Sequence, residues 1–331
     1  MIGAGTTLAV PAGRGGPDVV TFGEALVVFV ASPSVPLASA TRFHRTVAGA
    51  EFNVAVGLAR LGHEVSFIGR VGDDPHGQLA LRALRAEQVN TDGLLVDPSA
   101  PTGMLVRDAH ADRPVTVTYF RTGSAGSRLH AEQVTGHPIR SARILVATGI
   151  TAVLSPSARD ATFAAVQTAR DAGVLVAVDP NIRRKLAPLA DQLDDLRRLC
   201  AFADVVIAGE DEAAPISGIS GPDPKLAGFF LDRGSQLVVI KRGPAGAWAS
   251  DGLSDWSQPA FPVRAVDPVG AGDAFAAGLL SGLLTNLPIA DALVRAAACG
   301  AMAVAVAGDF EGAPTLAEVG GFLEDGNAIG R

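Results

Sequence analysis

The chain has 331 residues, of which 48% are hydrophobic and 18% are charged. This composition is too apolar for a disordered chain, and the length is sufficient for a large buried core. The 27 basic and 34 acidic residues give a net charge of −7 without a long basic run, which excludes a nucleic-acid binder that works through its overall field.

Residues 1–17 have neither a basic start nor a long apolar run, so we expect a flexible N-terminal extension and not a signal peptide. Residues 18–31 are rich in valine and phenylalanine and predict a long strand, interrupted at Gly23 and Glu24. Residues 41–48 predict a short exposed strand, and residues 102–121 predict a hairpin with its turn at residues 110–114.

The rest of the chain alternates between apolar strand patterns and helical patterns. Such alternation predicts βαβ crossovers and a mostly parallel central sheet flanked by helices. We therefore expect one α/β domain over residues 18–325. Two strand-rich excursions, at about residues 28–48 and 102–122, do not fit the alternation, and we expect them to pair as a small β-sheet lid. Strands are predicted at residues 65–69, 144–147, 174–178, 205–208 and 236–241, helices at residues 51–61, 77–87, 156–172, 188–200 and 222–233, and a second hairpin at residues 244–263.

Cysteine content and hydropathy indicate where the protein works. Cys200 and Cys299 are the only cysteines, and without a CxxC pair they favour a reducing cytoplasm over a disulfide framework or a zinc site. The mean hydropathy is +0.30, yet the uncharged stretch at residues 274–290 falls short of the roughly 20 strongly apolar residues of a membrane span. We expect a cytoplasmic protein without a membrane partner.

Residues 266–275, VDPVGAGDAF, carry the clearest chemical information. A strand is expected to enter this segment and a long helix to leave it. Gly270 and Gly272 allow a tight turn whose amides, together with the helix amino end, bind phosphate. Asp273 in the first helical turn could take a proton from an attacking hydroxyl. Taken alone, the segment could equally be an ordinary turn followed by a helix carboxylate.

Several ordered motifs make the chemical interpretation more specific. They are GAEFN at residues 49–53, GRVGDDPHG at 69–77, DPNIR at 179–183, GEDE at 209–212 and KRGPAG at 241–246. With the glycine turn, these motifs closely resemble the ribokinase-like (PfkB) family of carbohydrate kinases over roughly residues 18–320. The resemblance implies a ribokinase-like fold and an ATP-dependent sugar kinase that uses Mg²⁺.

The resemblance also implies roles for the matching residues. Asp273 would be the general base, and the amides around Gly270, Ala271 and Gly272 would form an anion hole for the transferred phosphate. Glu212 would act on magnesium through water. The nucleotide would be lined by Lys241, Gly243, Gly246, Gly270 and Gly272.

Asp267 and Gly209 lie in or near these motifs and bear on cation and phosphate binding. Asp267 would help to bind a monovalent cation such as K⁺ beside the anion hole, as in some relatives. Gly209 stands where the family often has asparagine, which removes one side chain from the phosphate region but leaves the Glu212 role in place.

An aromatic residue and two arginines indicate where the sugar that accepts the phosphoryl group would bind. In VTVTYFR, a period of two places Val117, Tyr119 and Arg121 on one face. Arg183 follows a strand end, where α/β folds bind ligands. Arginine pairs well with carboxylates, so the pattern favours an acidic sugar. The alternatives are an exposed lid edge for Tyr119 and Arg121, and a surface cation for Arg183.

The resemblance narrows to the subgroup that phosphorylates the primary hydroxyl of 2-keto-3-deoxygluconate. In that subgroup the residues matching Gly49, Tyr119, Arg121 and Arg183 hold the sugar acid, with Asn53 and Asp273 beside them. Fructokinases share DPNxR and a similar lid, so fructose is an alternative acceptor. An inactive sugar- or nucleotide-binding regulator is a third hypothesis, and the exposed lid strand suggests a homodimer through the lid.

Overall fold

The computed structural model describes residues 5–32, 35–108, 115–136 and 138–328. Its main element is a sheet A of mostly parallel strands in the order β13-β12-β11-β10-β9-β8-β1-β4-β5. Only β12 and β13 at one edge run antiparallel to their neighbours. The strands are β1 (Val19–Gly23), β4 (Val65–Gly72), β5 (Leu94–Asp97), β8 (Ile144–Thr148), β9 (Leu175–Asp179), β10 (Val205–Gly209), β11 (Leu237–Lys241), β12 (Ala247–Ser250) and β13 (Asp255–Gln258).

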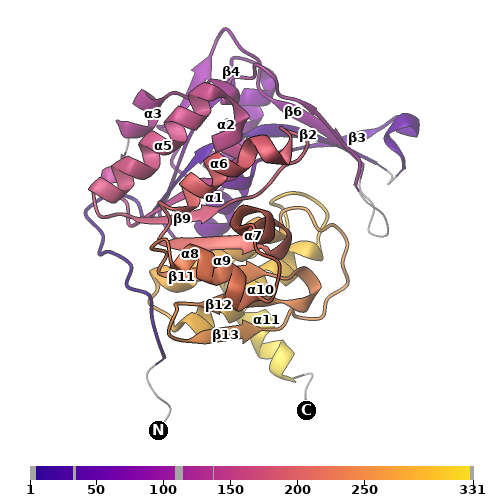
Figure 1. Cartoon of the computed structure of the whole chain (residues 1–331). Coiled ribbons are helices and arrows are strands. Elements are labelled where there is room, and N and C mark those ends of the chain that lie inside the picture. Colours follow the sequence, from indigo (N-terminus) through magenta and orange to yellow (C-terminus); the bar gives the residue numbers. More distant parts are fainter. Residues whose placement is uncertain (1–4, 33–34, 109–114, 137, 329–331) are drawn as a thin grey trace.

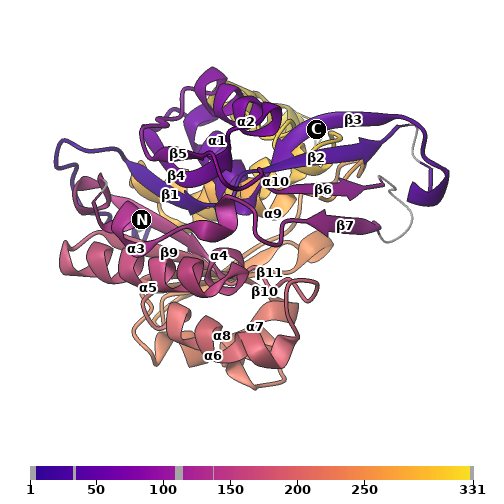
Figure 2. The same ribbon diagram turned by 90° about the horizontal axis from the view of Figure 1, so that it is seen from above.

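Helices cover both faces of sheet A, as the alternating pattern predicts (Figures 1 and 2). One face packs against α1 (Ala50–Arg60), α2 (Pro75–Ala86), α9 (Ala271–Leu284), α10 (Ile289–Val304) and α11 (Leu316–Ala328). The other packs against α3 (Ala131–Thr135), α4 (Gly149–Leu154), α5 (Pro156–Asp171), α6 (Leu189–Cys200), α7 (Glu210–Ser217) and α8 (Asp223–Leu231).

The central strands supply both hydrophobic cores because successive side chains point to opposite faces. In β9, Leu175 and Ala177 join the core under α1 and α9, whereas Val176 and Val178 join the core under α5 and α6. A strand buried on both faces must be apolar along its whole length. This explains why the central strands are continuous apolar runs in the sequence.

A smaller sheet B lies apart from sheet A and has the order β3-β2-β6-β7. Its strands are β2 (Leu26–Ala31), β3 (Phe43–Ala48), β6 (Met104–Arg107) and β7 (Val117–Phe120). Both predicted excursions meet here through the parallel pairing of β2 with β6, so the separate small sheet is confirmed. It projects from the main body in both views (Figures 1 and 2). The predicted turn at residues 110–114 lies within the stretch that the structure does not describe.

The predicted long strand at residues 18–31 is in fact two strands in two sheets. β1 ends at Gly23 in sheet A, and β2 begins at Leu26 in sheet B. A Cβ at Gly23 would lie 2.5 Å from the Glu51 carboxyl carbon, so a glycine is needed where the chain crosses. The interruption seen in the sequence marks this crossover.

Residues 5–17 form no helix or strand but pack on the domain, which differs from the loose extension that their composition predicts. Leu8 is buried and belongs to the same hydrophobic core as α9 and α10. The Thr6 carbonyl accepts a 2.9 Å hydrogen bond from the Ile289 amide, and the Pro11 carbonyl accepts one of 3.0 Å from the Arg143 side chain. Apolar burial and these backbone contacts hold the segment in place.

The prediction of a strand leading into the glycine turn is wrong. Residues 259–269 form no strand. Pro259, Pro262 and Pro268 lack the amide that a sheet ladder requires. Instead, the amides of Val266 and Asp267 donate to one carbonyl, that of Val304, at 2.8 and 3.2 Å.

Candidate active site

Polar groups gather at the carboxyl ends of three neighbouring parallel strands. β9, β10 and β11 end in Asp179, Gly209 and Lys241, and Gly209 lies opposite Lys241 in the ladder. Ligands of open α/β sheets bind outside this edge. Sheet B branches from the same edge, because β2 begins just after β1 ends.

The glycine turn forms the amino end of α9. Gly270 has a φ of 76°, and a Cβ there would lie 1.8 Å from the Asp309 carbonyl oxygen, so only glycine fits. The first amides of a helix, here those of Ala271, Gly272 and Asp273, have no acceptor within the helix. Their dipoles attract an anion. The structure therefore places the predicted anion-hole residues at an open helix start.

Asp273 lies directly beside those amides. Its Oδ2 accepts a 2.7 Å hydrogen bond from Nδ2 of Asn53. Removal from water raises the pKa of Asp273 to about 7, and the carboxylate of Asp179 adds to this, while Asn53, Arg183 and Lys241 oppose it. A carboxylate with a pKa near neutrality can take up a proton in one step and release it in the next.

Asn53 and Gly49 are linked through the start of α1. Gly49 precedes the helix with a φ of 146°, and a Cβ there would lie 2.3 Å from the Glu24 carbonyl oxygen. The helix therefore starts against the crossover between the two sheets, which brings Asn53 to Asp273. Asn53 is buried, and its Oδ1 has no hydrogen-bond partner among the described residues. Such an acceptor is available to a ligand hydroxyl.

Lys241 is held beside the anion hole by a carboxylate. Its Nζ donates to Oδ2 of Asp179 at 2.6 Å. A Cβ on Gly272 would lie 3.7 Å from the same Nζ. Burial alone would lower the pKa of Lys241, but the carboxylates of Asp179 and Glu212 raise it above its usual value. The ammonium group therefore stays charged next to the amides that face an anion.

Glu212 connects two of the strand ends. Its Oε1 accepts from the Ile182 amide at 2.9 Å, and its Oε2 accepts from the Gly209 amide at 2.7 Å. Burial raises the pKa of Glu212, and the nearby Asp179 carboxylate raises it further. The side chain therefore links the loops after β9 and β10. Each of its oxygens has a further lone pair that neither amide uses.

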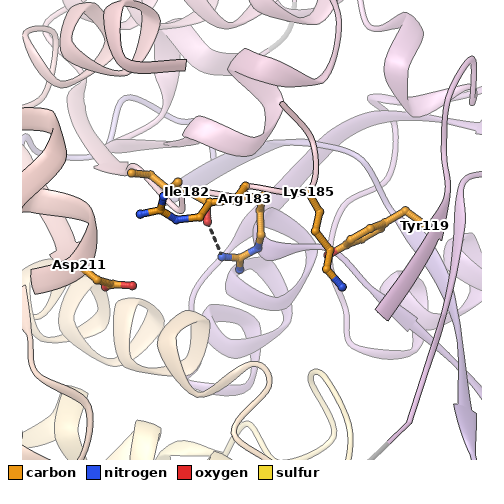
Figure 3. A pocket seen from close by; sticks show the side chains of 6 residues that line it. Tyr119, Ile182, Arg183, Lys185 and Asp211 are labelled. Carbon is orange, nitrogen blue, oxygen red and sulfur yellow. Dashed lines mark hydrogen bonds between the residues drawn. The ribbon is translucent and has the colours of Figure 1, made fainter. Parts of the chain in front are cut away.

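A cavity of about 290 Å³ lies between sheet B and the loop after β9. Figure 3 shows Tyr119 at one end and Asp211 at the other, with Arg183 and Lys185 between them. Lys185 donates from Nζ to the Val117 carbonyl at 2.9 Å, which joins the loop to β7. Asp273 does not line this cavity, although Arg183, which does, is close enough to lower the pKa of Asp273. The lining residues are Tyr119, Ile182, Arg183, Arg184, Lys185 and Asp211.

Arg121 occupies a different environment from the one its spacing predicts. It shares a face with Tyr119 as expected, and its Cζ lies 5.6 Å from the Tyr119 ring centre. However, its side chain is buried and ion-paired with Glu24, with Nε 2.7 Å and Nη2 2.5 Å from Oε2. Ser124 donates to the other oxygen of that carboxylate. The Arg121 charge is thus already balanced inside the protein.

Two of the predicted nucleotide residues, Gly243 and Gly246, lie in the turn after β11, whereas Lys241 ends that strand and Gly270 and Gly272 lie at the start of α9. Gly243 and Gly246 have φ values of 54° and 92°. A Cβ on Gly246 would lie 2.0 Å from the Gln258 carbonyl oxygen, so the turn packs tightly against the end of β13. A second cavity of about 460 Å³ opens beside this turn and is lined by Glu210, Asp211, Ala214, Lys241, Arg242 and Gly243.

Sequence reasoning missed three buried carboxylates near the site. Asp179 holds Lys241, and its position at a strand end in DPNIR is a signal that could have found it. Glu24 holds Arg121. Glu51 accepts from the Thr148 hydroxyl at 2.6 Å, and burial raises its pKa. A charged residue beside an otherwise apolar run is the only sequence sign of the last two.

An open helix start with a carboxylate and a fixed lysine beside it, at the strand ends of an α/β sheet, is the arrangement of a phosphotransferase. A family model for the pfkB family of carbohydrate kinases matches residues 17–316. The chain belongs to this family and is a sugar kinase. Among the residues that the structure describes, no helix is long and apolar enough to cross a membrane.

Two curated relatives are similar over most of their length. One is 2-dehydro-3-deoxygluconokinase of Bacillus subtilis, 36% identical, with 92% of this chain and 95% of the relative covered. The other is fructokinase of Klebsiella pneumoniae, 37% identical, with 80% and 88% covered. The sequence relatives therefore agree on sugar phosphorylation and differ in the sugar.

Two solved structures share the fold. A PfkB protein from Polaromonas sp. JS666 has a TM-score of 0.84 at 36% identity, with 92% of this chain and 99% of that chain covered. A fructokinase double mutant from Vibrio cholerae, solved with fructose, ADP and a potassium ion, has a TM-score of 0.82 at 27% identity, with 94% and 100% covered. The ribokinase-like fold expected from the sequence is confirmed.

Proposed function

We propose that this sugar kinase transfers the γ-phosphoryl group of ATP to the primary hydroxyl of a sugar acid of the 2-keto-3-deoxygluconate type. The observation that carries the proposal is the cationic cavity under sheet B. Arg183, Arg184 and Lys185 are exposed and line one cavity with Tyr119. Clustered cations beside an aromatic hydroxyl suit an acceptor that carries a carboxylate.

Asp273 is the proposed general base. The acceptor hydroxyl gives its proton to the Asp273 carboxylate while its oxygen forms a bond to the γ-phosphorus. The bond from that phosphorus to the bridging oxygen of ADP breaks in line with the attack. Asn53 holds the carboxylate through the 2.7 Å contact, and its unpaired Oδ1 is available to orient the sugar.

The transferred group gains negative charge density on its outer oxygens as the reaction proceeds. The amides of Gly272 and Asp273 at the start of α9 would face this position, and the Ala271 amide, which contacts the Pro268 carbonyl at 3.4 Å, lies beside them. Donors placed in advance stabilise such charge without reorganising. Lys241 adds a full positive charge beside Gly272. Asp179 keeps the lysine in place and does not contact the phosphate in this arrangement.

The carboxylate of Glu212 fits a hydrated magnesium ion near the ATP phosphates. Mg²⁺ retains several waters and prefers oxygen ligands, and Glu212 accepts only one amide on each oxygen. When bound, the metal would neutralise charge on the nucleotide phosphates. Glu212 would hold one of its waters, as the sequence predicts.

Sheet B and the second cavity would enclose the two substrates. The cavity beside Lys241 and Gly243 lies next to the anion hole, which suits a nucleotide whose phosphates reach Gly270 and Gly272. Closure of sheet B over the acceptor would exclude water and limit ATP hydrolysis. Lys185, which already contacts β7, would form one of the closing contacts.

Fructose is the second candidate acceptor, and one specific observation favours it. Arg121 is neutralised by Glu24, so only the cations after β9 remain to hold a carboxylate. A neutral ketose needs no such charge, and the similar fructokinase of Klebsiella pneumoniae supports this candidate.

The predicted homodimer through the lid stays a prediction. Phe43 on β3 and Phe120 on β7 are 41% and 54% exposed, and both lie on the outer strands of sheet B. Unpaired outer strands with exposed aromatic rings are suited to contact a second copy.

An ADP-release screen over sugar acids, neutral ketoses and nucleosides tests the proposal. We expect the highest kcat/KM with 2-keto-3-deoxygluconate or a close sugar acid, and a phosphate ester on its primary carbon by ³¹P-coupled NMR. Preference for fructose would move the assignment to the second candidate. Sugar binding without ADP release from any acceptor would favour the regulator hypothesis.

A further inference from the structure

A buried arginine connects sheet B to the anion hole. Arg107 ends β6, is 2% exposed, and ranks among the largest fully buried side chains. Its Nη2 donates to Oδ2 of Asp267 at 2.7 Å and to Oδ2 of Asp309 at 3.2 Å. The guanidinium therefore joins a lid strand to two carboxylates from separate loops.

Both carboxylates border the glycine turn. Asp267 lies within the loop that leads to Gly270, and its Oδ1 accepts from the Val269 amide at 3.2 Å. The Asp309 carbonyl packs so closely on Gly270 that a Cβ would lie 1.8 Å away. Two buried negative charges next to a phosphate site would repel each other and the phosphate unless a cation balances them.

The residues present do not fit a monovalent cation at Asp267. A potassium ion is bound in the similar Vibrio cholerae fructokinase structure, and the sequence predicts such an ion here. In this chain both Asp267 oxygens already accept N–H donors, from Val269 on one side and from Arg107 and Gly308 on the other. An ion placed on the same oxygens would face the fixed positive charge of Arg107.

We propose that the Arg107 guanidinium takes the place of the monovalent cation beside the anion hole, so that catalysis is independent of K⁺. Arg107 supplies the positive charge between Asp267 and Asp309 from within the chain. Nη2 of the same guanidinium reaches both carboxylates, so one positive side chain links the loops that carry Asp267 and Asp309.

The first test compares the wild-type enzyme in potassium, sodium and tetramethylammonium chloride at one ionic strength. We expect turnover to differ by less than about twofold among the salts, and the unfolding temperature to differ by less than about 1 °C. A rise in turnover of about tenfold or more in potassium overturns the proposal. The unfolding temperature requires no acceptor, so this part stands apart from the proposed substrate.

The second test removes the charge with Arg107→Met and keeps it with Arg107→Lys. In tetramethylammonium we expect Arg107→Met to lose about tenfold or more in turnover, and potassium to restore part of that loss and raise its unfolding temperature. Arg107→Lys should stay independent of potassium. Arg45→Met, an exposed arginine on β3, is the matched control and should behave as wild type.

Two outcomes of the second test contradict the proposal. One is wild-type turnover of Arg107→Met in tetramethylammonium. The other is a loss that potassium, sodium and tetramethylammonium change equally, because that result assigns Arg107 to structure alone. If Arg107→Met does not fold, the wild-type salt series and Arg107→Lys still decide the question.

Discussion

Arg183, beside the strand ends of sheet A, and the two arginines of sheet B and its continuation differ in exposure and in ion pairing. At the strand ends, Asp273 has a pKa raised to about 7 by burial, and Arg183 is exposed beside a cavity. In sheet B and its continuation, Arg107 and Arg121 are 2% and 7% exposed, and both are paired with buried carboxylates.

The difference separates groups that act on ligands from groups that hold the fold. A charge committed to an internal carboxylate cannot also bind a substrate carboxylate without a large rearrangement, because breaking a buried pair leaves an uncompensated charge. In the proposed function, the open cations after β9 would bind the acceptor, whereas the paired arginines of sheet B are part of the fold.

The largest expected effect is at the strand ends. Asp273→Asn removes the proposed base, and we expect turnover to fall by about 10²–10⁴-fold in an ADP-release assay. Asp291→Asn, in the first turn of α10 and exposed, is the matched helix-start control and should keep wild-type turnover. Turnover of Asp273→Asn within a few fold of wild type would remove Asp273 from the mechanism.

The next effect concerns stability in sheet B. Arg121→Met leaves the buried Glu24 carboxylate without its cation, and we expect a loss of about 3–5 kcal/mol in the free energy of unfolding, measured by urea denaturation. Arg45→Met again serves as the exposed control. An unfolding free energy equal to that of wild type would show that the Arg121 charge is free for a substrate after all.

A smaller effect is expected at the cavity. Arg183→Gln removes a charge-assisted hydrogen bond to a sugar acid, and we expect KM for the acid to rise by about 10–100-fold. The KM for fructose and the unfolding free energy should change little, since Arg183 is exposed. Equal changes in KM for both sugars would contradict the role of Arg183 in acid recognition.

The smallest expected effect is the change of kcat/KM with pH. The raised pKa of Asp273, about 7, means that the base is protonated and inactive below neutrality. We expect kcat/KM to fall by about tenfold between pH 8 and pH 6. A profile that stays flat down to pH 5 would contradict a base with this pKa.

The raised pKa of Asp273 also predicts how the stability of the protein depends on pH. Because the folded state binds the Asp273 proton more tightly than the unfolded state, stability is lost as the pH rises from the usual pKa of 3.8 to about 7, and the full cost is present above pH 7. Asp273→Asn should therefore unfold at a higher temperature than wild type at pH 8, and the advantage should shrink toward pH 5. A lower unfolding temperature at pH 8 would show that the carboxylate stabilises the fold.

Much of the architecture can be predicted from the sequence because the hydrophobic periodicity of a strand or helix is set by neighbouring residues. Apolar runs separated by helical patterns predicted the parallel sheet, and the glycines of VDPVGAGDAF predicted the helix start at Gly270. The two excursions that broke the alternation proved to be sheet B. The strand and helix patterns and the helix start depend on residues that are close together in the sequence, whereas the pairing of β2 with β6 in sheet B joins two distant segments.

The partners of buried charges were not predictable in the same way. A period of two placed Arg121 on the face of Tyr119, but its partner Glu24 lies on a crossover far away in the sequence. Arg107 is separated from its partners Asp267 and Asp309 by 160 and 202 positions in the sequence. Periodicity fixes the face of a side chain and leaves its ion-pair partner open.

The substrate preference of the wild-type enzyme is the most direct test of whether the exposed cations after β9, and not the ion-paired arginines of sheet B, recognise the acceptor. The measurement is kcat/KM for 2-keto-3-deoxygluconate against fructose under identical conditions. The exposed cations after β9 predict a preference for the acid of about tenfold or more, the value of one charge-assisted hydrogen bond. An equal or higher kcat/KM for fructose would contradict recognition of an acidic sugar by these cations.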